Sequence, residues 1–216
     1  QISTTYNTAS KAAARVMEEH PECRIYCVDS RRMSGALGLP TIYAQVMQNE
    51  GKTMDEVIAW LEENKYKVHQ MGPIDDLMFV ARRGRISTGK AILGSFAGVK
   101  PMGDCNSTGY VTVLTKVKGI KKALDVTVAY TKEAAVNVED QIVLVVHSNR
   151  EEYALQLCEK LREKISPKKI VMGDVYCASG TNIGPGMVGV YFLGENVSEN
   201  CETEKEIMNR VLESCK

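Results

Sequence analysis

The seven residues from Gln141 to His147, QIVLVVH, form a continuous apolar run between two polar ends. An apolar run of this length without alternation is typical of a strand that helices cover on both faces of a sheet. Directly after it, Ser148-x-x-Glu151 has the pattern of a helix cap. The helix that begins there would bury a single apolar face, made up of Ala154, Leu157, Cys158 and Leu161. The stretch therefore predicts a buried strand followed by a helix, the repeating unit of α/β proteins.

Outward from this unit, helical and extended patterns continue to alternate along the chain. Helices are predicted over residues 4–20, 35–51 (with Pro40 near the start), 75–84, 87–98 and 120–134, and near the C-terminus. A further helix opens with the capping box Thr53-x-x-Glu56 and buries Val57, Trp60 and Leu61. Strand-like segments are predicted at residues 23–28, 68–74, 99–106, 110–119, 168–176 and 187–194. This alternation predicts an α/β fold, although the chain opens at a helix rather than at a strand.

The composition excludes several classes of protein. Lysine plus arginine and aspartate plus glutamate number 27 each in the 216 residues, so the formal net charge is +0. We therefore expect no nucleic-acid partner and at most transient membrane contact, because both need a basic surface. No apolar run approaches the roughly 20 residues of a membrane span. The first residues lack the pattern of a secretory signal, and seven scattered cysteines suggest reduced thiols, so we expect a cytoplasmic protein.

The three histidines give little indication of chemistry. His147 ends the apolar strand, where α/β proteins often bind ligands, but a hydrogen-bonded residue at a strand–helix junction is the more ordinary interpretation. His20 and His69 are expected on the surface. Without a C-x-x-C or H-x-x-x-H pattern, we expect neither a metal site nor a cofactor, and no nucleophile–base pair is evident.

The segment Gly84 to Lys90 nearly matches a phosphate-binding loop, G-x-x-x-x-G-K-[ST]. Such a loop follows a strand and ends in a hydroxyl that holds magnesium. Here Ala91 takes the place of the hydroxyl, and the preceding residues have the spacing of a helix. A nucleotide-dependent kinase or ATPase built on Gly84 to Lys90 is the alternative function that this segment leaves open.

A second glycine pattern, G-x-G-x-x-G, occurs at Gly184, Gly186 and Gly189 within GTNIGPGMVGVYFLG. In dinucleotide-binding proteins this pattern opens a helix after a strand. The residues that follow here, MVGVYFLG, are strand-like, and a proline occupies the turn. The sequence therefore argues against dinucleotide binding and leaves the role of the Gly-Pro-Gly loop open.

Hydroxyl groups gather at the start of the first predicted helix, on Ser3, Thr4 and Thr5. A helix N-terminus offers free amides and the positive end of the helix dipole, and hydroxyls add further donors. Such a place can hold a carboxylate, although an ordinary helix cap uses the same residues.

Five motifs in unbroken order across residues 2–194 resemble the DegV family. ISTTYNTA resembles the family's L-S-G-T-Y-x-S-A, and CVDSRRMSGALG resembles its V-D-S…S-x-G-x-G. RRGRIS resembles G-G-R-I-S, and VKPMGDCNSTGYVTVLTKVKGIKKAL resembles I-K-P…G…K-x-R-G-x-x-K-A. GTNIGPGMVGVYFLG resembles the closing G-x-H-x-G-P-G…G-V-x-F.

The resemblance implies a two-domain DegV-like α/β fold, with an incomplete N-terminal domain and a mixed sheet in the C-terminal one. It implies a carrier, not an enzyme, that binds one long-chain fatty acid and offers its carboxylate to a fatty acid kinase catalytic subunit for acyl-phosphate formation. Ser3 and Thr4, with Asn182 of the glycine loop, would hold the carboxylate. Arg85 and Lys118 would lie near the head group or the kinase. The bound fatty acid would be the only ligand.

This sequence departs from the family pattern at several positions. Asn182 replaces a histidine, so it can donate a hydrogen bond but carries no charge. Lys118 replaces an arginine and loses the bidentate fork, and Thr4 replaces a glycine. Family members also begin with roughly another third of a chain that carries a T-S-x-P-S motif. The implied boundaries are residues 1–68 for the N-terminal lipid-binding domain, 69–194 for the C-terminal domain and 195–216 for a tail with a surface helix.

Overall fold

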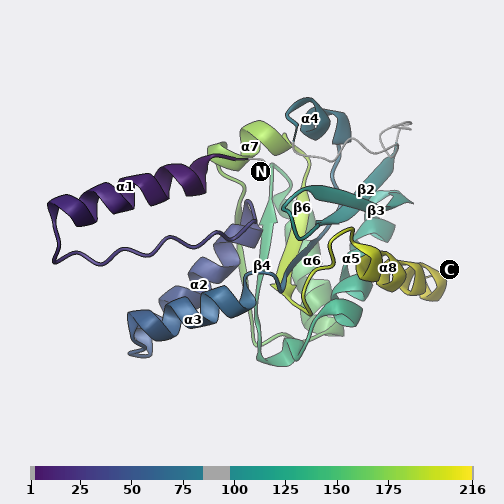
Figure 1. Cartoon of the computed structure of the whole chain (residues 1–216). Helices are drawn as coiled ribbons and strands as arrows, with labels where there is room; N and C mark the ends of the chain where they lie inside the picture. The colour runs from purple at the N-terminus through teal and green to yellow at the C-terminus, as the bar shows by residue number, and fades with distance from the viewer. Residues whose placement is uncertain (1–2, 85–97, 216) are drawn as a thin grey trace.

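A computed structural model describes residues 3–84 and 98–215 of the chain (Figure 1). In chain order the elements are α1 (Thr5–Glu19), α2 (Gly35–Asn49), α3 (Met54–Asn64), β1 (Val68–Met71), α4 (Leu77–Arg82), β2 (Val99–Cys105), β3 (Val111–Lys118), α5 (Ile120–Ala134), the 3-10 turn η2 (Val138–Asp140), β4 (Ile142–His147), α6 (Glu151–Lys164), β5 (Lys169–Asp174), α7 (Cys177–Ile183), β6 (Val188–Leu193) and α8 (Glu202–Ser214).

The main sheet has four strands in the order β1-β6-β4-β5. Strands β4 and β5 are parallel, whereas β6 pairs antiparallel with both β4 and β1. This confirms the predicted α/β fold with a mixed sheet. Strands β2 and β3 form a separate antiparallel hairpin around residues 106–109.

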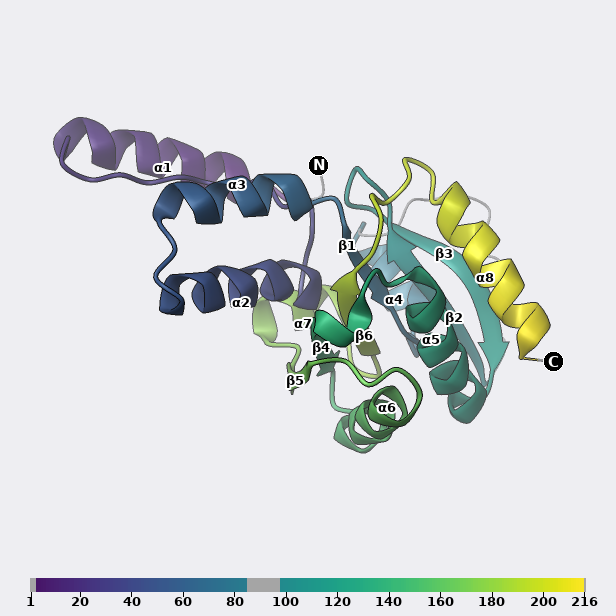
Figure 2. The same ribbon diagram turned by 90° about the horizontal axis from the view of Figure 1, so that it is seen from below.

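Strand β4, the QIVLVVH stretch, is buried on both faces, as its unbroken apolar run predicts. Val143 and Val145 face a core shared with α5, α6 and α8, whereas Leu144 and Val146 face a second core beneath α2. Figure 2 shows α2 and α3 on one side of the sheet and α5, α6 and α8 on the other. The predicted apolar face of α6 is buried in the first of these cores.

The N-terminal residues 3–31, called the arm below, contrast with this body. Helix α1 projects away from the sheet and its covering helices, and an extended segment returns from its far end to α2 (Figure 1). Only Ala13 of α1 is buried. At Arg32 the chain enters the body: its Nε donates to the Val68 carbonyl at 2.9 Å, and Nη1 donates to the Asn106 carbonyl at 3.1 Å.

The prediction of a strand at residues 23–28 is wrong. A strand is stabilised by hydrogen bonds to a neighbour, and no described strand lies beside this segment. Its side chains bond to α3 instead: Arg24 pairs with Asp55, and the Tyr26 hydroxyl donates to Glu62 at 3.3 Å. The β-branched and aromatic residues indicated an extended backbone but could not supply a partner.

Two neighbouring helices differ in how well their boundaries were predicted. Helix α2 begins at Gly35, so Pro40 lies inside the helix rather than near its start and removes one backbone donor there. The capping box of α3 is confirmed: Thr53 accepts from the Glu56 amide, and the Glu56 side chain accepts from the Thr53 amide. Trp60 of α3 is half-buried and packs against Tyr43, with the ring centroids 4.9 Å apart and the ring planes tilted by 32°.

Helix α8 is the surface helix predicted for the tail, and it buries one face against the body. It packs on α5, and it contributes Met208 and Val211 to the main core. Glu204 is also buried, because its carboxylate accepts hydrogen bonds from both the amide and the hydroxyl of Ser198. The sequence does not indicate that Glu204 is buried, because its partner Ser198 lies outside the helix, in the loop before it.

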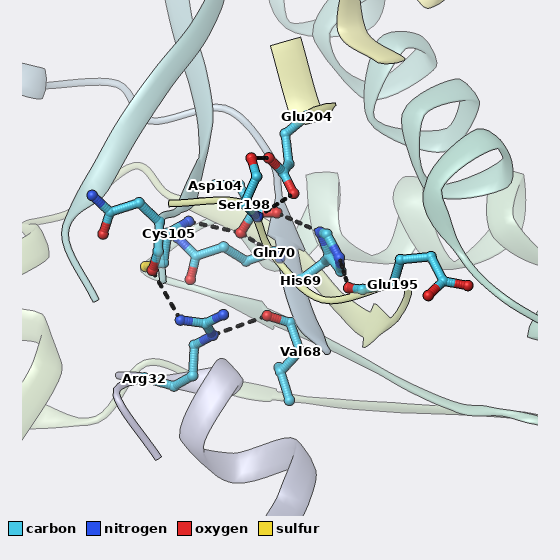
Figure 3. A network of polar contacts seen from close by, with 10 residues as sticks. Arg32, Val68, His69, Gln70, Asp104, Cys105, Glu195, Ser198 and Glu204 are labelled. Atoms are coloured by element: carbon cyan, nitrogen blue, oxygen red, sulfur yellow. Dashed lines mark hydrogen bonds and ion pairs between the residues drawn. The ribbon is translucent and has the colours of Figure 1, made fainter. Parts of the chain in front are cut away.

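His69 is buried, contrary to the surface position predicted for it, and Figure 3 shows it between Asp104 and Glu195. Its Nδ1 lies 2.8 Å from Asp104 Oδ2, and its Nε2 lies 2.8 Å from the Glu195 carbonyl. A carbonyl only accepts, so Nε2 must donate. Burial is the largest influence on the pKa of His69 and lowers it, but Asp104 and the Glu195 carbonyl together raise this pKa above its ordinary value.

Several remaining predictions concern short elements. Helices α4 and α5, the β2–β3 hairpin and strands β1, β5 and β6 form where the patterns indicate. Helix α7 was not predicted, because CASGTNI has a central glycine and no apolar period. The helix predicted over residues 87–98 lies, apart from its last residue, outside the described residues. No helix in the described part of the chain is long and apolar enough to cross a membrane.

Candidate functional site

The Gly-Pro-Gly loop, residues 184–186, connects α7 to β6. Gly184 and Gly186 have φ angles of 74° and 98°, a region that favours glycine. A side chain at Gly184 would meet the Phe79 ring at 2.9 Å, and one at Gly186 would overlap the Asp75 carboxylate. The glycines therefore allow close approach of other segments. Because a strand rather than a helix follows, this G-x-G-x-x-G does not have the setting of a dinucleotide site.

Ser148 fastens this loop to the end of β4. Its amide donates to the Met187 carbonyl at 2.8 Å, and its carbonyl accepts from the Gly186 amide at 2.8 Å. Its hydroxyl donates to the Gly184 carbonyl at 2.6 Å. The prediction that Ser148 caps α6 is therefore wrong. The N-cap residue is Arg150, whose side chain makes no cap hydrogen bond, and the Ser148 hydroxyl bonds to the loop instead.

Asp75 links the loop to two cations from other elements. One carboxylate oxygen pairs with Lys100 of β2, and the other accepts from Arg150 Nη2 at 2.8 Å. The side chains of Asp75, Lys100 and Arg150 are 24%, 20% and 36% exposed, so water screens these ion pairs only in part. We refer to Asp75, Lys100 and Arg150 as the Asp75 triad.

The triad lines a cavity of about 740 Å³ at the carboxyl ends of β4 and β5. Its lining combines charged and polar groups with apolar surface and consists of Asp75, Gly98, Lys100, Gly119, Ile120, His147, Asn149, Arg150, Glu151, Glu152, Tyr153 and Asp174. His147 is buried there, with Nδ1 3.4 Å from both the Arg150 amide and Asp174 Oδ1. The interpretation of His147 as a hydrogen-bonded residue at a strand–helix junction is confirmed.

The structure places the predicted site residues on different elements. Ser3 Oγ accepts from the Thr5 amide at 3.1 Å, whereas Thr4, at the cap of α1, makes no side-chain cap bond. Asn182 lies on α7, where its Nδ2 donates to the Ala178 carbonyl at 3.2 Å. Lys118 is exposed at the end of β3. Arg85 lies outside the described residues, and Ser3, Thr4, Asn182 and Lys118 share no hydrogen bond in the described structure.

Sequence reasoning missed the residues that hold the loop. Asp75 is the first residue of the helix predicted over residues 75–84, and its partners are 25 and 75 positions away. No local pattern announces such a pairing. A hint lay in Ser148, a polar residue between a buried strand and a helix. Within residues 3–84 and 98–215, no cluster of three or more potential ligands could hold a metal ion.

Fold and site together define an α/β protein with a mixed sheet, in which a braced glycine loop lies beside a cavity. Residues 1–195 match the DegV family, described as uncharacterised proteins. A DegV domain-containing protein of Clostridium perfringens is 35% identical over 194 residues, which are 90% of this chain and 67% of that protein. The chain belongs to the DegV family.

Two solved structures share this fold. A DegV family protein from Ruminococcus gnavus, described with vaccenic acid, is 25% identical with a TM-score of 0.80, and the match covers 88% of this chain and 68% of that one. The fatty acid kinase (Fak) B3 protein of Streptococcus pneumoniae, loaded with linoleic acid, also matches with a TM-score of 0.80. Its identity is 19%, over 90% of this chain and 68% of that one, and at this level the likeness shows the fold.

Proposed function

We propose that this chain binds a single long-chain fatty acid and presents its carboxylate to a fatty acid kinase. The observation that carries the proposal is the match, over 88% of the chain, to a DegV protein described with vaccenic acid. The described residues agree with a carrier, since binding an acyl chain requires an apolar surface and a few donors rather than a catalytic group.

The carboxylate would be held by neutral donors. The hydroxyls of Ser3 and Thr4 lie at the start of α1, where the positive end of the helix dipole favours an anion. The Asn182 amide can add a further hydrogen bond but no charge. Lys118 and Arg85 would then supply the positive charge near the head group or the kinase.

The acyl chain would lie along the apolar side chains of the arm and α2. Tyr6, Val16, Ile25, Tyr26 and Leu37 are each between 37% and 49% exposed. All five belong to α1, the segment that follows it, or α2, and these elements lie on one side of the molecule (Figure 1). Exposed apolar side chains on these elements could contact an apolar ligand, because a contiguous apolar surface of this kind is typical of a ligand-binding or partner-binding site.

A nucleotide-dependent kinase or ATPase at Gly84 to Lys90 has less support. The residues before Gly84 form helix α4, so the strand that a phosphate-binding loop requires does not precede it. Gly84 itself, with φ of 67°, ends that helix. The proposed carrier needs no nucleotide of its own and no cofactor, because the kinase would supply the phosphoryl group in the cytoplasm.

Titration of the delipidated chain with oleate in a calorimeter tests this proposal. We expect one oleate per chain, about tenfold weaker binding for Ser3→Ala and Asn182→Ala, and no change for the control Thr8→Ala on the same helix. Parallel titration with ATP should give no heat of binding. Saturable ATP binding without oleate binding would contradict the carrier and favour the nucleotide-dependent alternative.

A further inference from the structure

We propose that Asp75 is a positioning residue that fixes the Gly-Pro-Gly loop and, through the loop, the place of Asn182. The role of Asn182 in this inference rests on the proposed function. Asp75 touches neither helix α7 nor Asn182 through any bond found in the described structure, so its influence must pass through Gly186 and Gly184.

The first step is the contact between Asp75 and Gly186. The Asp75 carboxylate lies so close to the Gly186 Cα that no side chain fits there. Lys100 and Arg150 hold that carboxylate from two sides, one from β2 and the other from the start of α6. A carboxylate with two cationic partners on separate elements has little freedom to move, so Gly186 packs against a fixed surface.

The second step leads from Gly186 to helix α7. The Gly186 amide donates to the Ser148 carbonyl, and the Ser148 hydroxyl donates to the Gly184 carbonyl. The Gly184 amide in turn donates to the Gly180 carbonyl at 2.8 Å and closes the last turn of α7, which contains Asn182. The chain of contacts from the triad to Asn182 is therefore continuous.

The third step concerns the backbone next to Asp75, which is hydrogen-bonded to the hairpin and to β6. The Ile74 amide donates to the Pro101 carbonyl at 3.1 Å, and the Val188 amide donates to the Pro73 carbonyl at 3.2 Å. Residues 73–75 thus lie between the hairpin and the start of β6. Loss of the Asp75 charge would leave these backbone bonds in place but would break the ion pairs with Arg150 and Lys100. The Gly-Pro-Gly loop would therefore become more mobile while the fold persists.

Amide hydrogen exchange in the ligand-free full chain tests the inference directly. In Asp75→Asn we expect the Gly184 and Gly186 amides to exchange about tenfold faster, because the opening free energy of the loop falls. Arg150→Gln removes one anchor at a more exposed position and should give a smaller change in the same direction. Glu152→Gln is the matched control, since Glu152 lines the same cavity and bonds to Gln156 instead of to the triad.

Oleate affinity provides a second test of the inference. We expect Asp75→Asn to weaken binding about fivefold, and we expect it to weaken binding no further once Asn182→Ala is present, because Asp75 affects the ligand only through Asn182. Unchanged exchange at Gly184 and Gly186 in both folded Asp75→Asn and Arg150→Gln would overturn the inference, as would fully additive losses with Asn182→Ala. Should the wild type bind no oleate while the exchange result holds, the proposed function fails and the bracing of the loop stands.

Discussion

Helices α1 and α5 have the same length of 15 residues and opposite surroundings. Helix α5, in the body, is buried along a whole face that includes Leu124, Val128 and Tyr130. Helix α1, in the arm, buries Ala13 alone and leaves Tyr6 and Val16 exposed. Both helices carry apolar side chains at helical spacing, but only α5 has neighbouring elements that bury them. A helical pattern in the sequence therefore predicts the helix and not its burial.

The residues of the proposed head-group site also lie partly on the body and partly on the arm. Asn182 stands on α7, at the end of which begins the loop that Ser148 fastens to the body. Ser3 and Thr4 stand at the start of α1, on the arm. A ligand that engages both parts would tie the arm to the body, and its binding free energy would then depend on both.

The largest expected effect concerns packing. Phe192 is fully buried in the main core, and its ring lies beside those of His69 and Tyr130. Phe192→Ala should lower the free energy of unfolding by about 3–5 kcal/mol, the cost of a large cavity. Tyr6→Ala in the arm should change it by less than about 0.5 kcal/mol. Chemical denaturation of both variants measures the contrast, and equal losses would show that the arm is packed as the body is.

A second effect concerns the buried pair of His69 and Asp104. Because the folded protein raises the pKa of His69, the pair stabilises the fold fully below the unfolded value of about 6.5. That contribution is lost as the pH rises through the folded pKa. His69→Gln should therefore cost about 2–3 kcal/mol at pH 5 and less at alkaline pH.

Denaturation of the wild type and His69→Gln across this range provides the measurement. Leu157→Ala serves as the control, since Leu157 is buried in the main core on α6 and removal of its aliphatic side chain should cost the same at each pH. A stability difference between wild type and His69→Gln that grows toward alkaline pH would contradict a protonated His69.

The smallest effect is expected for the ion pair that joins the arm to α3. Arg24 and Asp55 have side chains that are 63% and 70% exposed, so solvent and salt screen their attraction. Arg24→Gln should leave the unfolding midpoint unchanged within error, at low and at high salt. A salt-dependent loss of stability in this variant would mean that the arm is fastened to the body by charge.

The sequence predicted the elements whose signal is local. The apolar run of β4, the face of α6 and the capping box at Thr53 each carry their own evidence within a few residues. Residues 23–28 looked like a strand, but a strand also needs a neighbour, and propensity cannot supply one. His69 and Asp104 are 35 positions apart, so neither reveals that the other compensates its burial.

The residues of the candidate site also differ in whether the local sequence reveals them. The glycines of the loop and the hydroxyls at the start of α1 were visible as motifs. Ser148 could not be assigned correctly, because a serine before a helix has an ordinary use as a cap and only the fold offers the alternative acceptor at Gly184. The Asp75 triad joins three distant segments, and long-range pairs of charges leave no periodic trace in a sequence.

Native mass spectrometry of the purified chain tests the central claim most directly, that this protein is a fatty-acid carrier. The account predicts a single mass increment equal to one long-chain fatty acid, lost on delipidation, restored by excess oleate and diminished in Ser3→Ala. An unmodified mass both before and after incubation with oleate, in a chain that circular dichroism shows to be folded, would contradict it.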